Sequence, residues 1–469
     1  MKLTAFVAAV LLGTAAMAQT AAPAPAAEAP KPTWTFALHG FVSMSAAYQQ
    51  GQFILSEGQQ SLGSATAASP VHDKDSLTFD VRQSRFNFSV KGPQVLAGAT
   101  PSAVMELDFM QGFGNGNFGD VSLLNRLRTA YSELDWGANR LQFGQQNDLV
   151  FAMAPVSLSH IAFPLGYFTG NIGWRRPGVF GYHTLAINSD LKLEGAWEVG
   201  RSQWADSAAC VVGPVAALPA GTTTCSGVGG AASAAPGGIN LGEASASPAV
   251  EGRVTLSYAK LATGFVAAHW NNVDLTGYGA QGGGQINPAT SSTHTLKVLA
   301  YNAGAKLTLP LPSDLVLSLA ATGFYGYNIY PLTANFTTGA SPTTAAGGTF
   351  RVGLDGQDIT TWGYWAQAGL NLSKEFSLWG FYGQQKLDQK RLVRSFNLTA
   401  PGATAYENAT TNVIAMYRDG GYGFSAEWIH FATKYGTGSD VTATAPGTAF
   451  ASNRTAKSDQ YMLTANYFF

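Results

Sequence analysis

Apolar and polar side chains alternate along most of this chain with a period of two residues. The last segment, 461–469, gives the clearest example, because one of its faces is formed by Tyr461, Leu463, Ala465, Tyr467 and Phe469. Successive side chains of a β-strand point to opposite faces, so this alternation predicts a strand. One apolar face that ends in aromatic residues is typical of a strand that faces lipid on one side and water on the other.

The same alternation predicts about sixteen strands in residues 34–469. They are expected near residues 34–48, 76–91, 101–112, 121–136, 139–146, 174–187, 190–203, 249–260, 262–273, 292–309, 313–328, 357–372, 375–388, 410–418, 422–434 and 456–469. Short turns rich in Gly, Asn, Asp and Pro alternate with long links rich in Gly, Ser and Thr. An even number of strands with this asymmetry predicts an all-β transmembrane antiparallel barrel with short periplasmic turns and long extracellular loops.

Parity assigns each side chain of a strand to the lipid or to the lumen. It places two acids and two bases in the lumen, namely Glu106, Asp108, Arg126 and Arg128. Beyond Arg128, strict alternation turns Thr129 and Tyr131 toward lipid and Ala130 toward the lumen.

The segment 76–91 contains a break in the alternation. Its apolar residues have odd numbers up to Val81 and even numbers from Phe86 onward. A one-residue slip flips every later side chain to the other face, so we expect a β-bulge between Arg82 and Arg85 that turns both arginines inward.

The two ends of the chain predict export to the outer membrane. Residues 1–18 have a positive start, an apolar run and a small-x-small site at Ala16-Met17-Ala18, as in a secretory signal peptide. Residues 19–33 are rich in Pro and Ala and are expected to form a periplasmic linker before the barrel at 34–469.

Composition excludes several classes of protein. Of the 469 residues, 12% are charged and the formal net charge is −1, so no basic surface for nucleic acid is expected. The 54 glycines and 12% aromatic residues suit turns and aromatic girdles. The histidines lack metal-binding spacing, the Gly-rich run at 114–119 is not followed by a helical pattern, and no catalytic set is clustered, so neither a metal nor a cofactor nor an enzyme is predicted.

Cys210 and Cys225 are the two cysteines of the chain, and they lie in a long Ala/Gly/Thr-rich link. An even pair at short spacing in an exported protein predicts a disulfide, although two free thiols remain the alternative.

Charged residues of both signs form the first candidate site, on the expected lumen wall. The predicted pore-lining residues are Arg82, Arg85, Glu106, Asp108, Arg126, Arg128, Arg175 and Arg176. Rings of charged side chains select ions in channels. The alternative is a set of ion pairs that only holds the barrel in shape, and the two roles are compatible.

The link at 147–173 is the second candidate site, because it is long and unusually apolar for an exposed loop. We expect it to fold into the lumen and to form a constriction with Asp148, Phe151, His160 and Phe163. A loop that lies over the rim or at a subunit contact is the alternative. With one acid in the loop and arginines opposite, the constriction is expected to favour anionic or dipolar solutes mildly.

Four short segments resemble those of Gram-negative outer-membrane porins, and the DcaP-like subgroup is the nearest. They are Ser84-Arg85-Phe86-Asn87-Phe88, residues 126–134, Leu141-Gln142-Phe143-Gly144-Gln145 and Trp174-Arg175-Arg176-Pro177-Gly178. The resemblance implies a sixteen-stranded homotrimer in the outer membrane with an inward third loop and a path for small hydrophilic, often anionic, solutes. The terminal strand, with Tyr461, Leu463, Tyr467 and Phe469, resembles the signal that the barrel-assembly machinery reads.

These observations favour a passive diffusion channel surrounded by outer-membrane lipid. The first alternative is a channel specific for a dicarboxylate, phosphate or sugar. The second is an enzyme or adhesin that uses the barrel as an anchor.

Overall fold

The protein is described from a computed structural model. The structure describes residues 33–51, 53, 58, 61–64, 75–115, 121–202, 245–274, 295–329, 332–333, 359–388, 404–439 and 449–469. The predicted signal peptide (1–18), most of the linker at 19–33 and both cysteines, Cys210 and Cys225, lie outside these residues, so those predictions remain predictions. Within the described part of the chain, no helix is long and apolar enough to cross a membrane.

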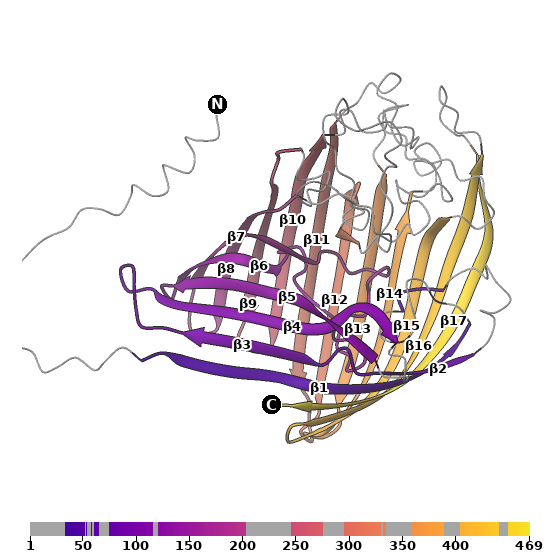
Figure 1. Ribbon diagram of the computed structural model, residues 1–469, viewed down its shortest axis with the longest axis horizontal. Helices are drawn as coiled ribbons and strands as arrows, with labels where there is room; N and C mark the ends of the chain where they lie inside the picture. Colours follow the sequence, from indigo (N-terminus) through magenta and orange to yellow (C-terminus); the bar gives the residue numbers. More distant parts are fainter. Residues whose placement is uncertain are drawn as a thin grey trace, which may run out of the picture.

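The described chain forms one closed antiparallel sheet (Figure 1). Its elements are β1 (Thr35–Gln50), β2 (Ser76–Asp80), β3 (Arg85–Lys91), β4 (Thr100–Asn115), β5 (Val121–Asp135), β6 (Asn139–Asn147), β7 (Arg175–Ala186), β8 (Leu191–Gly200), β9 (Ala249–Tyr258), β10 (Ala262–Asp274), β11 (Thr295–Pro310), β12 (Val316–Tyr327), β13 (Thr360–Asn371), β14 (Phe376–Leu387), β15 (Thr404–Asp419), β16 (Tyr422–Ser439) and β17 (Ala449–Phe468). β1 pairs with β17 and closes the barrel. β2 and β3 both pair with β1, so they are two halves of one strand of a sixteen-stranded barrel.

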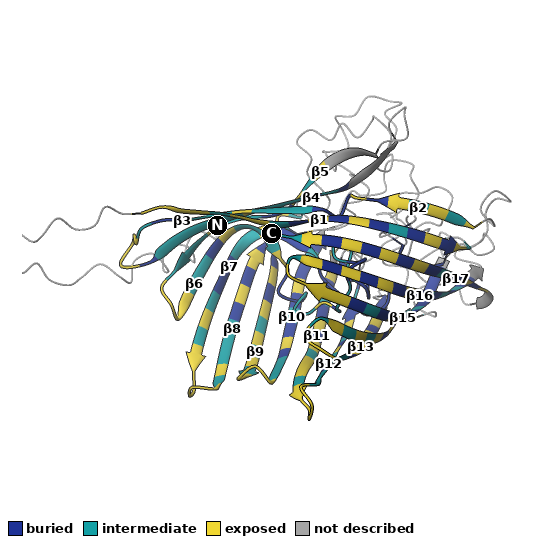
Figure 2. Ribbon diagram, turned by 90° about the horizontal axis from the view of Figure 1, so that it is seen from below, coloured by how far each residue is buried: buried dark blue, intermediate teal, exposed yellow. Residues whose placement is uncertain are grey.

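The two chain ends of the barrel meet at the rim of the short turns. Gly40 N donates to Phe469 O at 3.0 Å, and Phe469 N donates to Gly40 O at 3.1 Å. The predicted apolar face of β17 is the outer one, where Tyr461, Leu463 and Tyr467 are all exposed. Exposed and buried residues alternate along most strands, and the exposed large side chains are mainly apolar (Figure 2). This is the inside-out pattern of a barrel in lipid.

A one-residue irregularity separates β2 from β3, as the sequence predicts. Asp80 pairs with Ser45 and Arg85 pairs with Phe41, so the four residues 81–84 lie opposite the three residues 42–44. The Ser84 N–H donates to Val81 O at 3.1 Å and closes a turn. The extra residue brings Arg82 and Arg85 to the same side of the wall, where both are largely covered.

A second irregularity, in β5, corrects the predicted faces of that strand. Glu106 pairs with Thr129 whereas Leu107 pairs with Leu127, so Arg128 is an extra residue. Residues directly opposite each other share a face, and Glu106 faces the lumen, so Thr129 and Tyr131 face inward and Ala130 faces outward. The prediction of Thr129 and Tyr131 toward lipid is therefore wrong.

Candidate pore constriction

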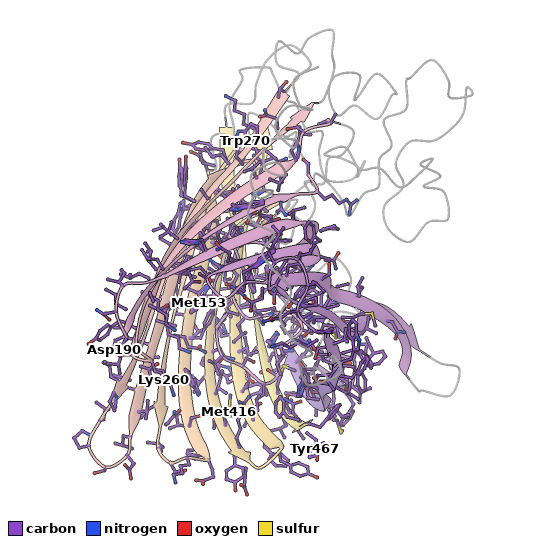
Figure 3. The ribbon with its side chains drawn as sticks, turned by 90° about the vertical axis from the view of Figure 1, so that its left-hand side faces the viewer. Met153, Asp190, Lys260, Trp270, Met416 and Tyr467 are labelled. Atoms are coloured by element: carbon purple, nitrogen blue, oxygen red, sulfur yellow. The ribbon has the colours of Figure 1, made fainter. Side chains whose placement is uncertain are left out.

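The segment 148–174 between β6 and β7 lies inside the barrel and crosses the lumen. Met153 packs against a buried cluster on β13–β17 that includes Trp365 and Ile429. The same methionine packs against a second cluster, formed with Phe265 on β10. Figure 3 shows Met153 within the body of the barrel, away from Asp190 and Lys260 at the turns. The predicted inward loop is thus present, and we call the segment 148–174 the constriction loop.

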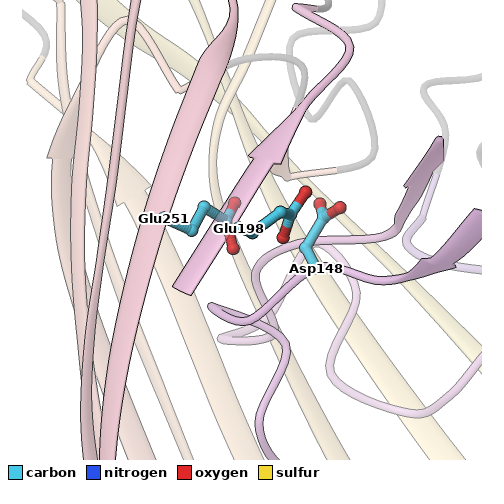
Figure 4. Close-up of side chains that lie close together, drawn as sticks. All are labelled: Asp148, Glu198 and Glu251. Atoms are coloured by element: carbon cyan, nitrogen blue, oxygen red, sulfur yellow. The ribbon is translucent and has the colours of Figure 1, made fainter. Parts of the chain in front are cut away.

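Three carboxylates and one guanidinium hold the base of the constriction loop. Arg176 Nε donates to Asp148 Oδ1 at 2.8 Å, and its Nη2 donates to Asp148 Oδ2 at 3.0 Å. Glu198 and Glu251 each lie 3.3 Å from the same guanidinium. The three acids converge from the loop, β8 and β9 (Figure 4). The Arg176 guanidinium supplies the positive charge of this buried cluster, which has almost no exposed surface.

The backbone of the loop base also bonds to this cluster. Leu149 N donates to Glu198 Oε2 at 3.3 Å, and Val150 N donates to Glu251 Oε2 at 2.8 Å. Trp174 N donates to Asp148 Oδ2 at 2.9 Å from the other end of the loop. A buried backbone N–H without a partner is costly, so these carboxylates allow an irregular segment to stay inside the barrel.

Glu427 on β16 holds the tip of the constriction loop. It accepts hydrogen bonds from Leu158 N at 3.1 Å, from Ser159 N at 3.0 Å and from the Ser157 hydroxyl at 2.9 Å. Gln83, between β2 and β3, also holds the tip, because its Nε2 donates to Leu158 O at 2.9 Å. The tip is therefore fixed to two positions of the barrel wall that are far apart in sequence but lie on nearby strands.

A network of ion pairs connects β3, β4 and β5. We call it the arginine wall, and it consists of Arg85, Glu106, Asp108, Arg126 and Arg128. Arg126 lies 2.6 Å from Asp108, and Arg128 lies 2.7 Å from Asp108 and 2.6 Å from Glu106. Arg85 lies 3.5 Å from Glu106. Arg126 lies directly opposite Asp108 in the strand register, and Arg128 is the extra residue on the same face, so both guanidinium groups reach Asp108.

The constriction loop meets the arginine wall through carbonyls and rings. The Ala162 carbonyl accepts from Arg128 Nη1 at 3.3 Å. The Arg126 guanidinium lies over the Phe163 ring, 4.8 Å from its centroid, and Arg175 lies over Trp174 at 4.1 Å. Aromatic faces attract cations, so the rings hold these guanidiniums without neutralising them.

The arginine wall with Arg175 carries excess positive charge. Four guanidiniums (Arg85, Arg126, Arg128 and Arg175) face two carboxylates (Glu106 and Asp108), which leaves a formal charge of +2. Arg175 has no carboxylate partner among the residues that the structure describes. The side chains of Arg85, Arg126 and Glu106 are 15–18% exposed, so this group touches the water-filled lumen.

The eight predicted charged residues therefore separate into three groups. Arg82 pairs with Asp80 at 2.6 Å. Arg176 belongs to the base cluster, and the other six residues lie in or beside the arginine wall. Asp148, the single acid of the constriction loop, binds Arg176 and does not pair with the arginine wall.

The aromatic and histidine residues predicted for the constriction have distinct places. The Phe151 ring is stacked on Tyr167, with centroids 6.1 Å apart. Phe163 meets Arg126. His160 is buried, and its Nδ1 lies 3.2 Å from Phe163 O. Burial lowers the pKa of His160, an effect that nearby Glu427 opposes, so this imidazole adds no fixed charge at neutral pH.

The acids Glu251 and Glu427 were not predicted as site residues. Both lie at lumen-facing positions of their strands, and this parity is the sequence signal that could have singled them out.

A closed barrel with an apolar outer face and a loop fixed inside the lumen is the architecture of bacterial outer-membrane porins. No protein-family model matches the chain, and no curated protein matches it by sequence. Among solved structures, it is similar to the outer membrane channel DcaP of Acinetobacter baumannii, with a TM-score of 0.56 and 15% identity over 93% of this chain and 97% of that one. It is also similar to an anion-selective porin from Comamonas acidovorans, with a TM-score of 0.51 and 10% identity over 93% of this chain and all (100%) of the other. These likenesses show that the chain has the porin fold.

Proposed function

We propose that this chain is an outer-membrane porin that lets small hydrophilic solutes diffuse through its lumen with a mild preference for anions. The observation that carries the proposal is the formal charge of +2 on the arginine wall with Arg175, beside the constriction loop. Charged side chains that line a narrow pore favour the passage of ions of the opposite sign. The side chains of the base cluster are almost fully covered, whereas those of Arg85, Arg126 and Glu106 in the arginine wall are partly exposed to the lumen.

Electrophysiology in planar lipid bilayers tests this proposal directly. Purified protein is inserted into the bilayer, and the reversal potential is measured across a KCl gradient. Stepwise conductance with a reversal potential of the sign for chloride is expected. Clear cation selectivity would contradict the proposed preference, and the absence of conductance would contradict the channel function itself.

A channel specific for an anionic solute is the second candidate. It is favoured by the aromatic rings that hold Arg126 and Arg175, because a fixed guanidinium between rings is pre-organised to bind a carboxylate or phosphate. In a specific channel, millimolar concentrations of the preferred anion block the chloride current, whereas a general porin shows no such saturable block.

The outer-membrane location, a homotrimeric assembly and assembly through the terminal strand belong to the same proposal. The porin fold of the barrel supports the location. The broad apolar outer face supports contact with lipid and with neighbouring subunits. Light scattering of the detergent-solubilised protein tests the subunit number.

A further inference from the structure

The outer face of the barrel changes from apolar to polar toward the rim of the long loops. Along β14 the outward residues are apolar at Phe376, Leu378 and Tyr382 but polar at Gln384 and Lys386. Ten residues separate Phe376 from Lys386. At about 3.3 Å per residue and a strand tilt of about 40°, Lys386 lies about 25 Å above the short-turn rim, which is the height of the apolar band of such barrels. Lys386 is therefore level with the outer edge of the lipid hydrocarbon.

A buried carboxylate holds two lysines at this level. Glu407 Oε2 lies 3.3 Å from Lys386 Nζ, and Glu407 Oε1 lies 2.6 Å from Lys434 Nζ. The Glu407 side chain is 10% exposed, whereas those of Lys386 and Lys434 are 36% and 45% exposed. An ammonium group has three donors, so each lysine keeps donors for a partner outside the wall.

A hydrogen-bonded chain fixes Glu407 in place. Gln384 Nε2 donates to Glu407 Oε1 at 3.1 Å, and the Tyr364 hydroxyl donates to Gln384 Oε1 at 3.2 Å. The positions of the two ammonium groups thus depend on a network of hydrogen bonds and ion pairs that extends over β13, β14, β15 and β16.

Lys457 on β17 adds a third ammonium to the same face. It is exposed and pairs in register with Ala432, which places it diagonally beside Lys434, at a spacing of about 7–8 Å for such neighbours. Lys457 has no carboxylate partner among the described residues. The three lysines and Glu407 together carry a formal charge of +2. Asp459 lies nearby and bonds to His430 and Trp428 at 3.0 Å each, and including it lowers the formal charge to +1.

We propose that this outer lysine patch, formed by Lys386, Lys434 and Lys457, binds the phosphate groups of a phosphorylated glycolipid in the outer leaflet. Its positive charge complements phosphate, and it lies where lipid head groups begin. The apolar surface below, with Tyr382 and Val413 exposed, can receive acyl chains. Protein–protein interfaces are depleted of lysine, so a lipid suits the patch better than a second copy of the chain.

A lipid-binding experiment on the full-length, detergent-solubilised protein tests the proposal. The triple variant Lys386→Gln, Lys434→Gln and Lys457→Gln is compared with Lys91→Gln, Lys260→Gln and Lys374→Gln, which removes three exposed lysines from the short-turn rim. Lipid A with two phosphates and the same lipid without phosphates are the probes, and native mass spectrometry counts the bound molecules. Each lysine near a membrane surface contributes measurably to anionic lipid binding, so the affinity of the patch variant for diphosphorylated lipid A should be weaker by at least about tenfold.

The outcomes separate the possible occupants. The control variant should bind diphosphorylated lipid A like the parent, and the dephosphorylated lipid should bind all three proteins equally weakly. Displacement of the lipid by inorganic phosphate at equal concentration would mean a site for the free anion and would overturn the proposal. Unchanged lipid binding by the patch variant, or a loss of oligomers with lipid binding retained, would also overturn it, the latter in favour of a subunit contact. Channel conductance is measured in parallel, so failure of this proposal is distinct from failure of the channel function.

Discussion

Arg176 on β7 binds both carboxylate oxygens of Asp148, at 2.8 and 3.0 Å, and so joins the two ends of the constriction loop. Asp148 is the first residue of the loop, and Arg176 follows its last residue by two positions. A paired arrangement of two N–H donors on two oxygens fixes orientation as well as distance. The loop is thus closed at its base by a bond that lies within the barrel wall.

Replacing Asp148 by Asn should loosen the base of the loop. Breaking one partner of a buried ion pair costs about 3–5 kcal/mol, although Glu198 and Glu251 remain to balance Arg176 and should reduce the loss. We expect a lower urea midpoint of unfolding and a larger, noisier single-channel conductance. The control is Asp190→Asn on an exposed turn, which should leave both unchanged. Unaltered conductance in Asp148→Asn would mean that other contacts suffice to hold the loop.

Replacing Glu427 by Gln should release the tip of the loop while the base stays closed. Hydrogen bonds to a charged group are worth about 1.5–3 kcal/mol each, and Glu427 accepts three from the loop. The neutral amide keeps one acceptor oxygen, so the hydrogen bonds to the tip should be lost only in part, and we expect rapid fluctuations of the single-channel current. A steady current like that of the parent would contradict the role of Glu427 as the tip anchor.

The alternation of side chains predicted the sixteen-stranded barrel because most strands separate lipid from lumen. It also revealed the slip before β3, since the apolar residues change from odd numbers at Leu77, Phe79 and Val81 to even numbers at Phe86 and Phe88. The bulge at Arg128 left no such trace. Thr129 and Ala130 are small enough for either face, so nothing in the sequence marks the change of register there.

The contacts of the constriction loop could be predicted only in part. Its apolar composition indicated an inward position, and Arg176 was recognised as a lumen residue. Which acid each backbone N–H would reach depends on the three-dimensional path of the loop. Glu251 lies 101 residues from its partner Val150, and parity alone does not specify such pairings.

Replacing Arg175 by Gln should weaken anion selectivity, because it lowers the formal charge of the arginine wall together with residue 175 from +2 to +1. The reversal potential in a KCl gradient should move toward zero. The shift should be larger at 0.1 M than at 1 M salt, since the screening length falls from about 10 Å to about 3 Å. The double variant Asp80→Asn and Arg82→Gln is the matched control, because it removes one acid and one base that pair with each other. A selectivity unaffected by Arg175→Gln would place the selective region elsewhere.

The bulge at Arg128 makes a prediction about two adjacent side chains of β5. With the bulge, Tyr131 faces the lumen and Ala130 faces lipid, whereas uninterrupted alternation requires the reverse. In a background with Cys210→Ser and Cys225→Ser, a cysteine introduced by Tyr131→Cys should react with a water-soluble, membrane-impermeant maleimide small enough to enter the lumen. A cysteine introduced by Ala130→Cys should react at least about tenfold more slowly, because lipid excludes the charged reagent from the outer face. Ser132→Cys, which shares the outward face with Ala130 nearer the rim, distinguishes shielding by lipid from poor access to the whole strand. Faster labelling at position 130 than at position 131 would show that β5 runs without a bulge.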